Sequence, residues 1–432
     1  MARFEKFQKL SLIRANPLAI GLILSSIILK SILLYFISTE ETFLENDSTR
    51  YMDLASNFFL NYLSPGNSPN PDSFYVTPGY PLFLSLFGGL EIRQIIFIQF
   101  CILGVSQLLC YRILRNLFEQ PIALLGLAMF LIESSTNLES FHILTETLFG
   151  LLFLCFLYFF SKSKNSKLNT IIAAVFLGSS LLVRPVAQIL IVALIITFLI
   201  SKEKKKIAIC IFLSGAILSS WLLRNEKVFG IPQLSGIQSL NLLYYEGSGA
   251  VSISRSQTLE KAQNIESARE VSVLGDSPTL IDVVNYRSER GIALIKDNFL
   301  GFVELHARGS FKILLGPGSA TIDEIMRHFP LGPFFGNILK SLSVSLSFIL
   351  AFLSLFSIFR LIRYRQSLQN YFQTFVAVSF LLLLVSSGGA NAYSRFRVPL
   401  VPLEILLSVN SITYFKYKFY EWKNFSTTNK NI

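Results

Sequence analysis

The sequence predicts an all-α polytopic membrane protein: a bundle of about ten transmembrane helices with a small, α-rich extracytoplasmic module. Of its 432 residues 52% are hydrophobic and only 15% are charged, and the mean hydropathy is +0.54. A soluble protein of this size carries about a quarter charged residues. Long apolar runs recur through most of the chain, and the basic residues gather in short segments between them. Lipid is therefore the expected solvent for most of the chain.

Ten apolar runs are interpreted as spanning helices. The first follows a basic N-terminal segment that contains Arg3, Lys6, Lys9 and Arg14. It is expected to be a membrane helix rather than a cleavable signal, because Pro17 to Ser38 is too long for a signal-peptide core and no small-residue cleavage site follows. The ten runs cover residues 17–38, 94–112, 121–138, 146–161, 168–183, 186–201, 207–223, 338–360, 371–388 and 398–415.

The basic residues also predict the orientation. With the N-terminus inside, the inner loops hold clusters such as Lys202 to Lys206, whereas the short outer loops hold few basic residues. Cytoplasmic loops are enriched in Lys and Arg, so both termini are expected to be cytoplasmic. An inner (cell) membrane is expected, since Lys430-Asn431-Ile432 is no endoplasmic-reticulum retrieval signal. The formal charge of +11 resides mainly in these inner segments, and no nucleic-acid partner is expected.

Two outer segments are long, 40–93 and 224–331. The first contains an apolar stretch ending at Leu90 that is too short to span and is expected to lie at the interface or to dip in and out. The second shows helical patterning from Leu280 through Leu315. We predict a membrane catalytic module at 1–223 with the outer loop 40–93, an extracytoplasmic module at 224–331, and C-terminal transmembrane helices at 332–432.

Two carboxylates are predicted at helix entrances on the same outer side of the membrane. Asp47 follows the first span by about nine residues, and Glu146 opens the fourth. Carboxylates are costly near hydrocarbon, so this placement indicates a site and favours an enzyme. For a single outer-loop carboxylate, a solvated side chain is the ordinary alternative.

Glu139, His142 and Glu146 are spaced by three and four residues. If the helix begins early enough, they share one helical face and could hold a divalent metal. The alternative is an ordinary acidic helix start with Thr145 as the cap. No cofactor is certain, and a metal site formed by Asp47, His142 and Glu146 is kept as an alternative.

Four cations are candidates for binding a phosphate. Arg184, Arg395 and Arg397 lie on the less basic outer side, where guanidinium groups near carboxylates suit a phosphate. A snorkelling anchor at the interface would be the simpler explanation for any one of them. Lys30 lies well inside the first span, where it either climbs outward or faces the bundle interior and joins the same anion site.

The order of the motifs resembles the GT-C superfamily of integral-membrane glycosyltransferases. Within it, the branch of dolichyl-phosphate-mannose–protein mannosyltransferases and the bacterial lipid A aminoarabinose transferase is the most similar. The motifs that carry the resemblance are Glu45-Asn46-Asp47, Pro78-Gly79-Tyr80-Pro81-Leu82-Phe83-Leu84, Leu144-Thr145-Glu146, Leu182-Val183-Arg184-Pro185, Trp221-Leu222-Leu223-Arg224-Asn225 and Arg395-Phe396-Arg397-Val398-Pro399.

This resemblance implies a polyprenyl-phosphate-linked sugar donor and inverting transfer on the extracytoplasmic face. Asp47 would act on the acceptor as a general base or through a metal, with Glu146 as the second acid, and Glu45, Tyr80 and His142 would belong to the acceptor or donor pocket. Many relatives carry a second acid beside the first-loop Asp; here Ser48 follows Asp47, which leaves Glu45 for that role. Some relatives have Lys where this chain has Thr77, so more of the phosphate binding falls to the arginines.

The leading interpretation is a hexosyl or pentosyl transferase that modifies a glycan, lipid or protein of the cell envelope, with acceptor recognition between Arg224 and Leu331. A lipid-linked glycan ligase or polymerase would share the donor site. A flippase-type transporter would show charged residues through the middle of several helices, and Lys30 is nearly alone there. An inactive scaffold is disfavoured because Asp47 and Glu146 are both present.

Overall fold

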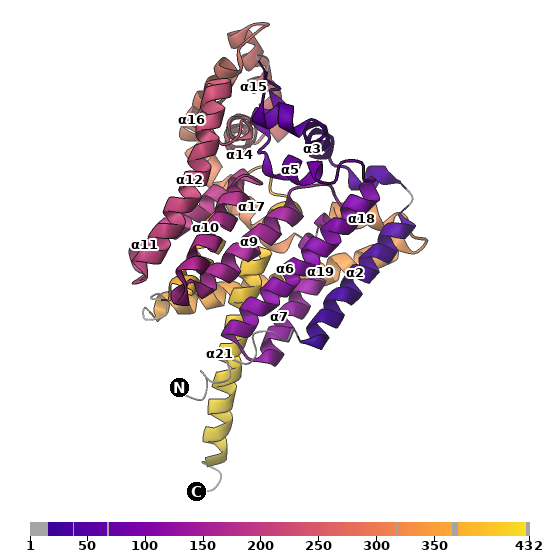
Figure 1. Ribbon diagram of the computed structural model, residues 1–432, viewed down its shortest axis with the longest axis vertical. Coiled ribbons are helices and arrows are strands. Elements are labelled where there is room, and N and C mark those ends of the chain that lie inside the picture. The colour runs from indigo at the N-terminus through magenta and orange to yellow at the C-terminus, as the bar shows by residue number, and fades with distance from the viewer. Residues whose placement is uncertain (1–15, 38, 67–68, 317, 365–369, 429–432) are drawn as a thin grey trace.

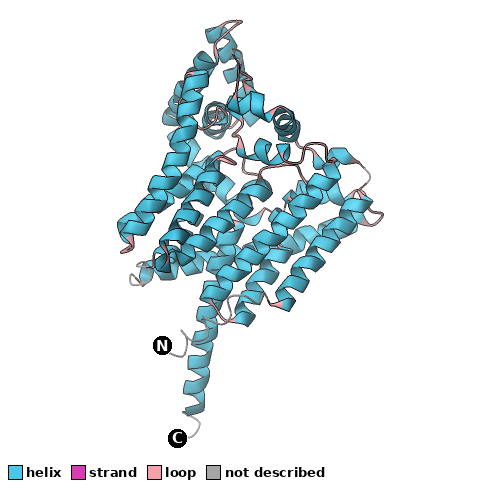
Figure 2. Cartoon of the chain, in the orientation of Figure 1, coloured by secondary structure: helices cyan, strands magenta, loops and turns pink. Residues whose placement is uncertain are grey.

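The computed structural model describes residues 16–37, 39–66, 69–316, 318–364 and 370–428. Within these ranges the regular elements are helices and no strand occurs (Figures 1 and 2). The all-α prediction is therefore confirmed. The basic N-terminal residues and the Lys430-Asn431-Ile432 end, on which part of the predicted orientation depends, lie outside the described residues.

Each predicted span overlaps at least one helix. In the described part of the chain, four helices are long and apolar enough to cross a membrane by length and composition: α2 (Pro17–Phe36), α6 (Ile92–Leu117), α12 (Lys204–Phe229) and α19 (Gly332–Arg363). The total of ten spans remains a prediction. The other overlapping helices are α7 (Gln120–Ile132), α9 (Glu146–Lys162), α10 (Lys167–Leu181), α11 (Gln188–Ile200), α20 (Tyr371–Ser386) and α21 (Val401–Thr428).

Several helix ends differ from the predicted boundaries, and two of the differences have local reasons. The run 121–138 is broken at Glu133, whose carboxylate accepts hydrogen bonds from the backbone of Ser135 and Thr136 and so caps a separate helix, α8 (Ser134–Glu139). Helix α12 continues past residue 223 to Phe229. It ends where Gly230 adopts a left-handed conformation with φ of 73°, which glycine reaches without steric cost.

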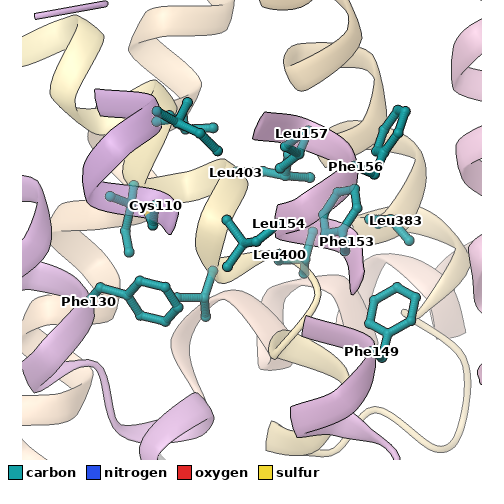
Figure 3. Packing of buried hydrophobic residues seen from close by; sticks show 14 of the residues in the cluster. Cys110, Phe130, Phe149, Phe153, Leu154, Phe156, Leu157, Leu383, Leu400 and Leu403 are labelled. Carbon is teal, nitrogen blue, oxygen red and sulfur yellow. The ribbon is translucent and has the colours of Figure 1, made fainter. Parts of the chain in front are cut away.

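The apolar core surrounds α9, the helix that Glu146 opens. Four phenylalanines, at positions 149, 153, 156 and 160, follow one another along this helix with ring centroids 5.2 to 6.3 Å apart. Leu383 of α20 and Leu400 and Leu403 near the start of α21 lie in the same cluster (Figure 3). Since such close-packed interiors deform little, α9 provides a rigid base for its first residue.

The outer segments form a helical layer at one end of the bundle, while α21 extends from the opposite end (Figure 1). The patterning from Leu280 to Leu315 corresponds to two helices, which Asn298 separates. The elements of this layer are η1 (Glu40–Phe43), α3 (Asn46–Ser56), η2 (Phe59–Leu63), α4 (Asp72–Tyr75), α5 (Gly79–Ser85), α13 (Ile237–Asn241), η5 (Leu242–Gly247), α14 (Ser248–Ser254), α15 (Leu259–Leu274), α16 (Leu280–Asp297), α17 (Phe299–Leu315) and α18 (Ser319–Met326).

Hydrogen bonds fix this layer to the bundle and to the first outer loop. At the end of α12, Trp221 donates to the carbonyl of Leu234 (3.0 Å) and Asn225 donates to that of Gln233 (2.7 Å). The backbone N–H of Gly236 in turn donates to the carbonyl of Phe74 in the first outer loop (3.0 Å). The segment after α12 therefore joins both outer segments into one wall.

Candidate active site

A cavity of about 600 Å³ lies where the outer layer meets the ends of the bundle helices. Its lining comes from α3, from residues 75–77, from the start of α9, from residues 183–189 and 235–246, and from the segments on either side of residue 390. Four predicted site residues line it together: Asp47, Glu146, Arg184 and Arg395. Asp47 and Arg395 are nearly 350 residues apart in the sequence, so it is the fold that brings these side chains together.

Asp47 is the second residue of α3, where the helix dipole favours a carboxylate. The start of this helix is fixed by a capping box between Glu45 and Ser48. The hydroxyl of Ser48 also donates to the carbonyl of Ile143, 2.9 Å away, which ties α3 to the turn before α9. The Asp47 side chain remains 40% exposed, so a substrate hydroxyl can reach it.

Glu146 is the first residue of α9 and is almost completely buried. It forms an ion pair with Arg184 and accepts a hydrogen bond from the Thr145 hydroxyl (3.3 Å). Arg184 also donates to that hydroxyl (3.2 Å). Thr145 occupies the cap position of α9 but makes no side-chain capping bond; its hydroxyl is used to orient the ion pair instead.

Arg395 interacts electrostatically with both carboxylates. Its Nη1 is 3.5 Å from Oδ2 of Asp47. Burial alone would lower the pKa of Arg395, but the carboxylates of Glu146 and Asp47 raise it above its ordinary value, so the guanidinium stays charged. Burial and then the same two carboxylates raise the pKa of Tyr51, so its hydroxyl stays protonated at the cavity wall.

The two proline motifs contact each other and position Arg184. The N–H of Gly79 donates to the carbonyl of Leu182 (2.7 Å), and the Thr77 hydroxyl donates to the carbonyl of Val183 (3.0 Å). A Cβ at Gly79 would lie 2.7 Å from both the Leu182 oxygen and Cγ2 of Val183. Glycine is thus required for this close approach, and Thr77 has a positioning role.

Three predicted members of the site lie elsewhere. Glu45 caps α3 and does not line the cavity. Tyr80 is fully buried behind the cavity wall, where its hydroxyl donates to Gln99 (2.9 Å) and its ring contacts Tyr51. Lys30 faces the bundle interior and donates to Ser26 (2.8 Å), away from the anion site it was expected to join.

Arg397 also lies outside the cavity lining, although it follows Arg395 by only two residues. It is fully buried, with Nη2 2.7 Å from Glu404 and Nε 3.5 Å from Glu133, and Nη1 donates to the carbonyl of Leu314. A phosphate has no access to this group. The guanidinium instead links α8, α17 and α21.

The predicted metal ligands do not come together. Helix α8 ends at Glu139 and α9 begins at Glu146, so the expected common helical face with His142 does not exist. His142 is buried, with Nδ1 3.4 Å from Glu139 and Nε2 4.0 Å from Glu324, and it does not line the cavity. Among the described residues no group of three or more His, Cys, Asp and Glu side chains could hold a metal ion. We therefore derive no metal-dependent step.

The cavity also contains residues that the sequence did not predict. Arg50, 3.2 Å from Asp72, and Tyr51 follow Asp47 on α3, and helical spacing from Asp47 could have indicated them. Glu246 reaches the cavity from η5 in the outer module. No motif marks Glu246, and its position depends on tertiary packing alone.

One protein-family model matches the sequence. It describes the dolichyl-phosphate-mannose-protein mannosyltransferases and covers residues 80–223, one third of the chain, including Glu146 and Arg184. This match confirms the predicted relationship to the GT-C superfamily of glycosyltransferases. No curated protein matches the chain in sequence.

Solved structures of the Archaeoglobus fulgidus oligosaccharyltransferase AglB resemble the chain weakly. The complex with an inhibitory peptide and a dolichol-phosphate is 12% identical, with a TM-score of 0.46, and the match covers 94% of this chain and 52% of that one. The apo form is 14% identical, with a TM-score of 0.49 and coverages of 94% and 52%. The chain therefore spans about half the length of these structures.

Proposed function

We propose that this GT-C glycosyltransferase moves a sugar from a polyprenyl-phosphate-linked donor to a cell-envelope acceptor on the extracytoplasmic face, with inversion at the sugar carbon and Asp47 as the general base. One observation carries the proposal: two carboxylates and two arginines form two ion pairs, Glu146 with Arg184 and Asp47 with Arg395, in the lining of a single cavity at the bundle end. A lipid-linked donor suits a cavity between membrane helices and an outer layer.

Asp47 and Glu146 suit different tasks because their surroundings differ. Asp47 is accessible and pairs with Arg395 at 3.5 Å, so it can accept the proton of an acceptor hydroxyl as the hydroxyl attacks the sugar carbon. Glu146 is nearly inaccessible and is held by Arg184. Its role is to fix Arg184, which together with Arg395 would stabilise the negative charge that develops on the departing polyprenyl phosphate.

The test is transfer by purified protein in nanodiscs, with a panel of radiolabelled polyprenyl-phosphate sugars as donors and a crude envelope extract as acceptor. Asp47→Asn keeps the side-chain volume and removes the base, so we expect a loss of roughly 100-fold or more, the usual contribution of a positioned base. Asp53→Asn is the matched control, since Asp53 is an exposed residue of the same helix outside the cavity.

Label that moves with the wild type and the control, but not with Asp47→Asn, supports the transferase and identifies its donor. Near-normal transfer by Asp47→Asn would exclude the proposed base. Absence of transfer from every donor, with folded wild-type protein, would contradict the proposed reaction.

A further inference from the structure

The lining of the cavity includes a carboxylate that the proposed reaction does not use. Glu246 lies in η5, a turn of π-helix in the outer module, and its side chain is 24% exposed. Such turns interrupt α-helices frequently at functional sites. The charged partner of Glu246 is an imidazole rather than a guanidinium: Nε2 of His306, on α17, lies 2.7 Å from its Oε2.

The hydrogen bonds of His306 determine its protonation. Its Nδ1 lies 2.8 Å from the carbonyl oxygen of Val385, which can only accept, so Nδ1 carries a proton. Nε2 can then donate to the Glu246 carboxylate only when the ring is the imidazolium. Burial would lower the pKa of His306, but the bond to Glu246 raises it above its ordinary value. This hydrogen bond holds one oxygen of Glu246 against His306.

The carboxylate of Glu246 also lies close to the backbone of Gly389. A Cβ at position 389 would lie 2.1 Å from Oε1 of Glu246 and 2.8 Å from its Cδ. The flexible end of the glutamate would have to move away from such a group. Glycine at this position thus allows the carboxylate to lie against the main chain, with His306 as its other contact.

Two neutral polar side chains also line the cavity. Gln238 and Asn241 belong to α13, the helix that directly precedes η5, and amides both donate and accept hydrogen bonds, whereas a carboxylate only accepts. These side chains suit neutral hydroxyl groups, because a hydroxyl group both donates and accepts hydrogen bonds. A phosphate would be repelled by Glu246 and attracted to Arg184 and Arg395 on the bundle side. The cavity thus offers two kinds of binding surface.

We propose that Glu246, held by His306 and Gly389, is a specificity-determining residue that accepts hydrogen bonds from the hydroxyl groups of a sugar ring in the cavity. This inference rests on the proposed function and adds the recognition of the sugar to it. The ring can belong to the donor or to a glycan acceptor, because both present the same hydroxyl chemistry.

Binding measurements show whether the sugar ring belongs to the donor or to the acceptor, and they do not depend on turnover. Nanodiscs with full-length protein carrying Asp47→Asn are titrated with polyprenyl phosphate, with the same lipid bearing glucose, galactose or mannose, and with glycans released from the envelope. Glu246→Gln and Gly389→Ala are each combined with Asp47→Asn in a separate protein. Gly389→Ala keeps the charge of Glu246 but displaces its carboxylate. Glu304→Gln is the control, because Glu304 is an exposed residue of α17 outside the cavity.

We expect both variants to bind one sugar-bearing ligand about 10- to 100-fold more weakly, the usual effect of losing a hydrogen bond to a charged group, with affinity for the bare lipid phosphate unchanged. A loss confined to the glycosylated lipids assigns the contact to the donor sugar, and a loss confined to the free glycans assigns it to the acceptor. Affinities equal to those of the Glu304→Gln control for every ligand would overturn the inference. The transfer assay with Asp47→Asn reports separately on the proposed function.

Discussion

Arg395 and Arg397 stand two positions apart in one short helical turn, η7 (Ser394–Arg397), and each lies beside two carboxylates, yet their surroundings differ. The Arg395 side chain is 29% exposed and lines the cavity. Arg397 is fully buried, with Glu133 and Glu404 as its partners. Both residues are arginines of the same motif, so their access to the cavity decides which of the two can contact a substrate.

The partners of the two guanidinium groups explain the difference. Three nitrogens of Arg397 face three different groups: Nη2 faces Glu404, Nε faces Glu133 and Nη1 the carbonyl of Leu314. A buried guanidinium needs such partners, since an unpaired charge in the interior is very costly. Within the described residues Arg395 makes one hydrogen bond, to Asp47. Its other donors are available to a ligand.

The largest effect is expected from Arg397→Met. Removing one member of a buried ion pair leaves uncompensated charge on the other, which costs about 3–5 kcal/mol. Glu404 would lose its partner, whereas Glu133 would keep the two backbone hydrogen bonds that it accepts. We therefore expect a large fall in thermal stability, measured in detergent, or failure to obtain monodisperse protein.

Adding Glu404→Met to Arg397→Met removes both charges and should restore part of the stability, because apolar replacement of a whole buried pair is often neutral. This double variant is the control for Arg397→Met. If the single variant kept the wild-type unfolding temperature and lost only donor binding, Arg397 would be a ligand contact after all, and the comparison would fail.

Arg395→Ala should leave folding intact and impair the reaction. The loss of one group that stabilises developing charge typically reduces turnover by about 10²–10³, and we expect the apparent KM for the donor to rise while acceptor preference stays the same. Steady-state transfer with donor and acceptor varied in turn measures this. An unchanged donor requirement would remove Arg395 from the phosphate site.

The sequence predicted the helices and four of the residues that line the cavity for identifiable reasons. Apolar runs bounded by charged loops located the bundle helices, and Asp47, Glu146, Arg184 and Arg395 were marked by their positions at helix ends. For Arg397 an available signal was missed: Glu404 lies within the predicted span 398–415, where a carboxylate needs a partner. Glu246 could not have been predicted in this way, because only the packing of the outer layer brings it to the cavity.

The smallest effect is expected from Arg395→Lys, and the same exchange at Arg397 is its comparison. Lysine keeps the charge but offers its donors from a single nitrogen. At Arg395 the charge that interacts with Asp47 and Glu146 is the essential property, so Arg395→Lys should reduce donor kcat/KM by roughly tenfold or less. At Arg397 one ammonium cannot reach Glu404, Glu133 and the Leu314 carbonyl together. Arg397→Lys should therefore destabilise the fold nearly as much as Arg397→Met. Equal unfolding temperatures for the two lysine variants would mean that the two arginines are equivalent.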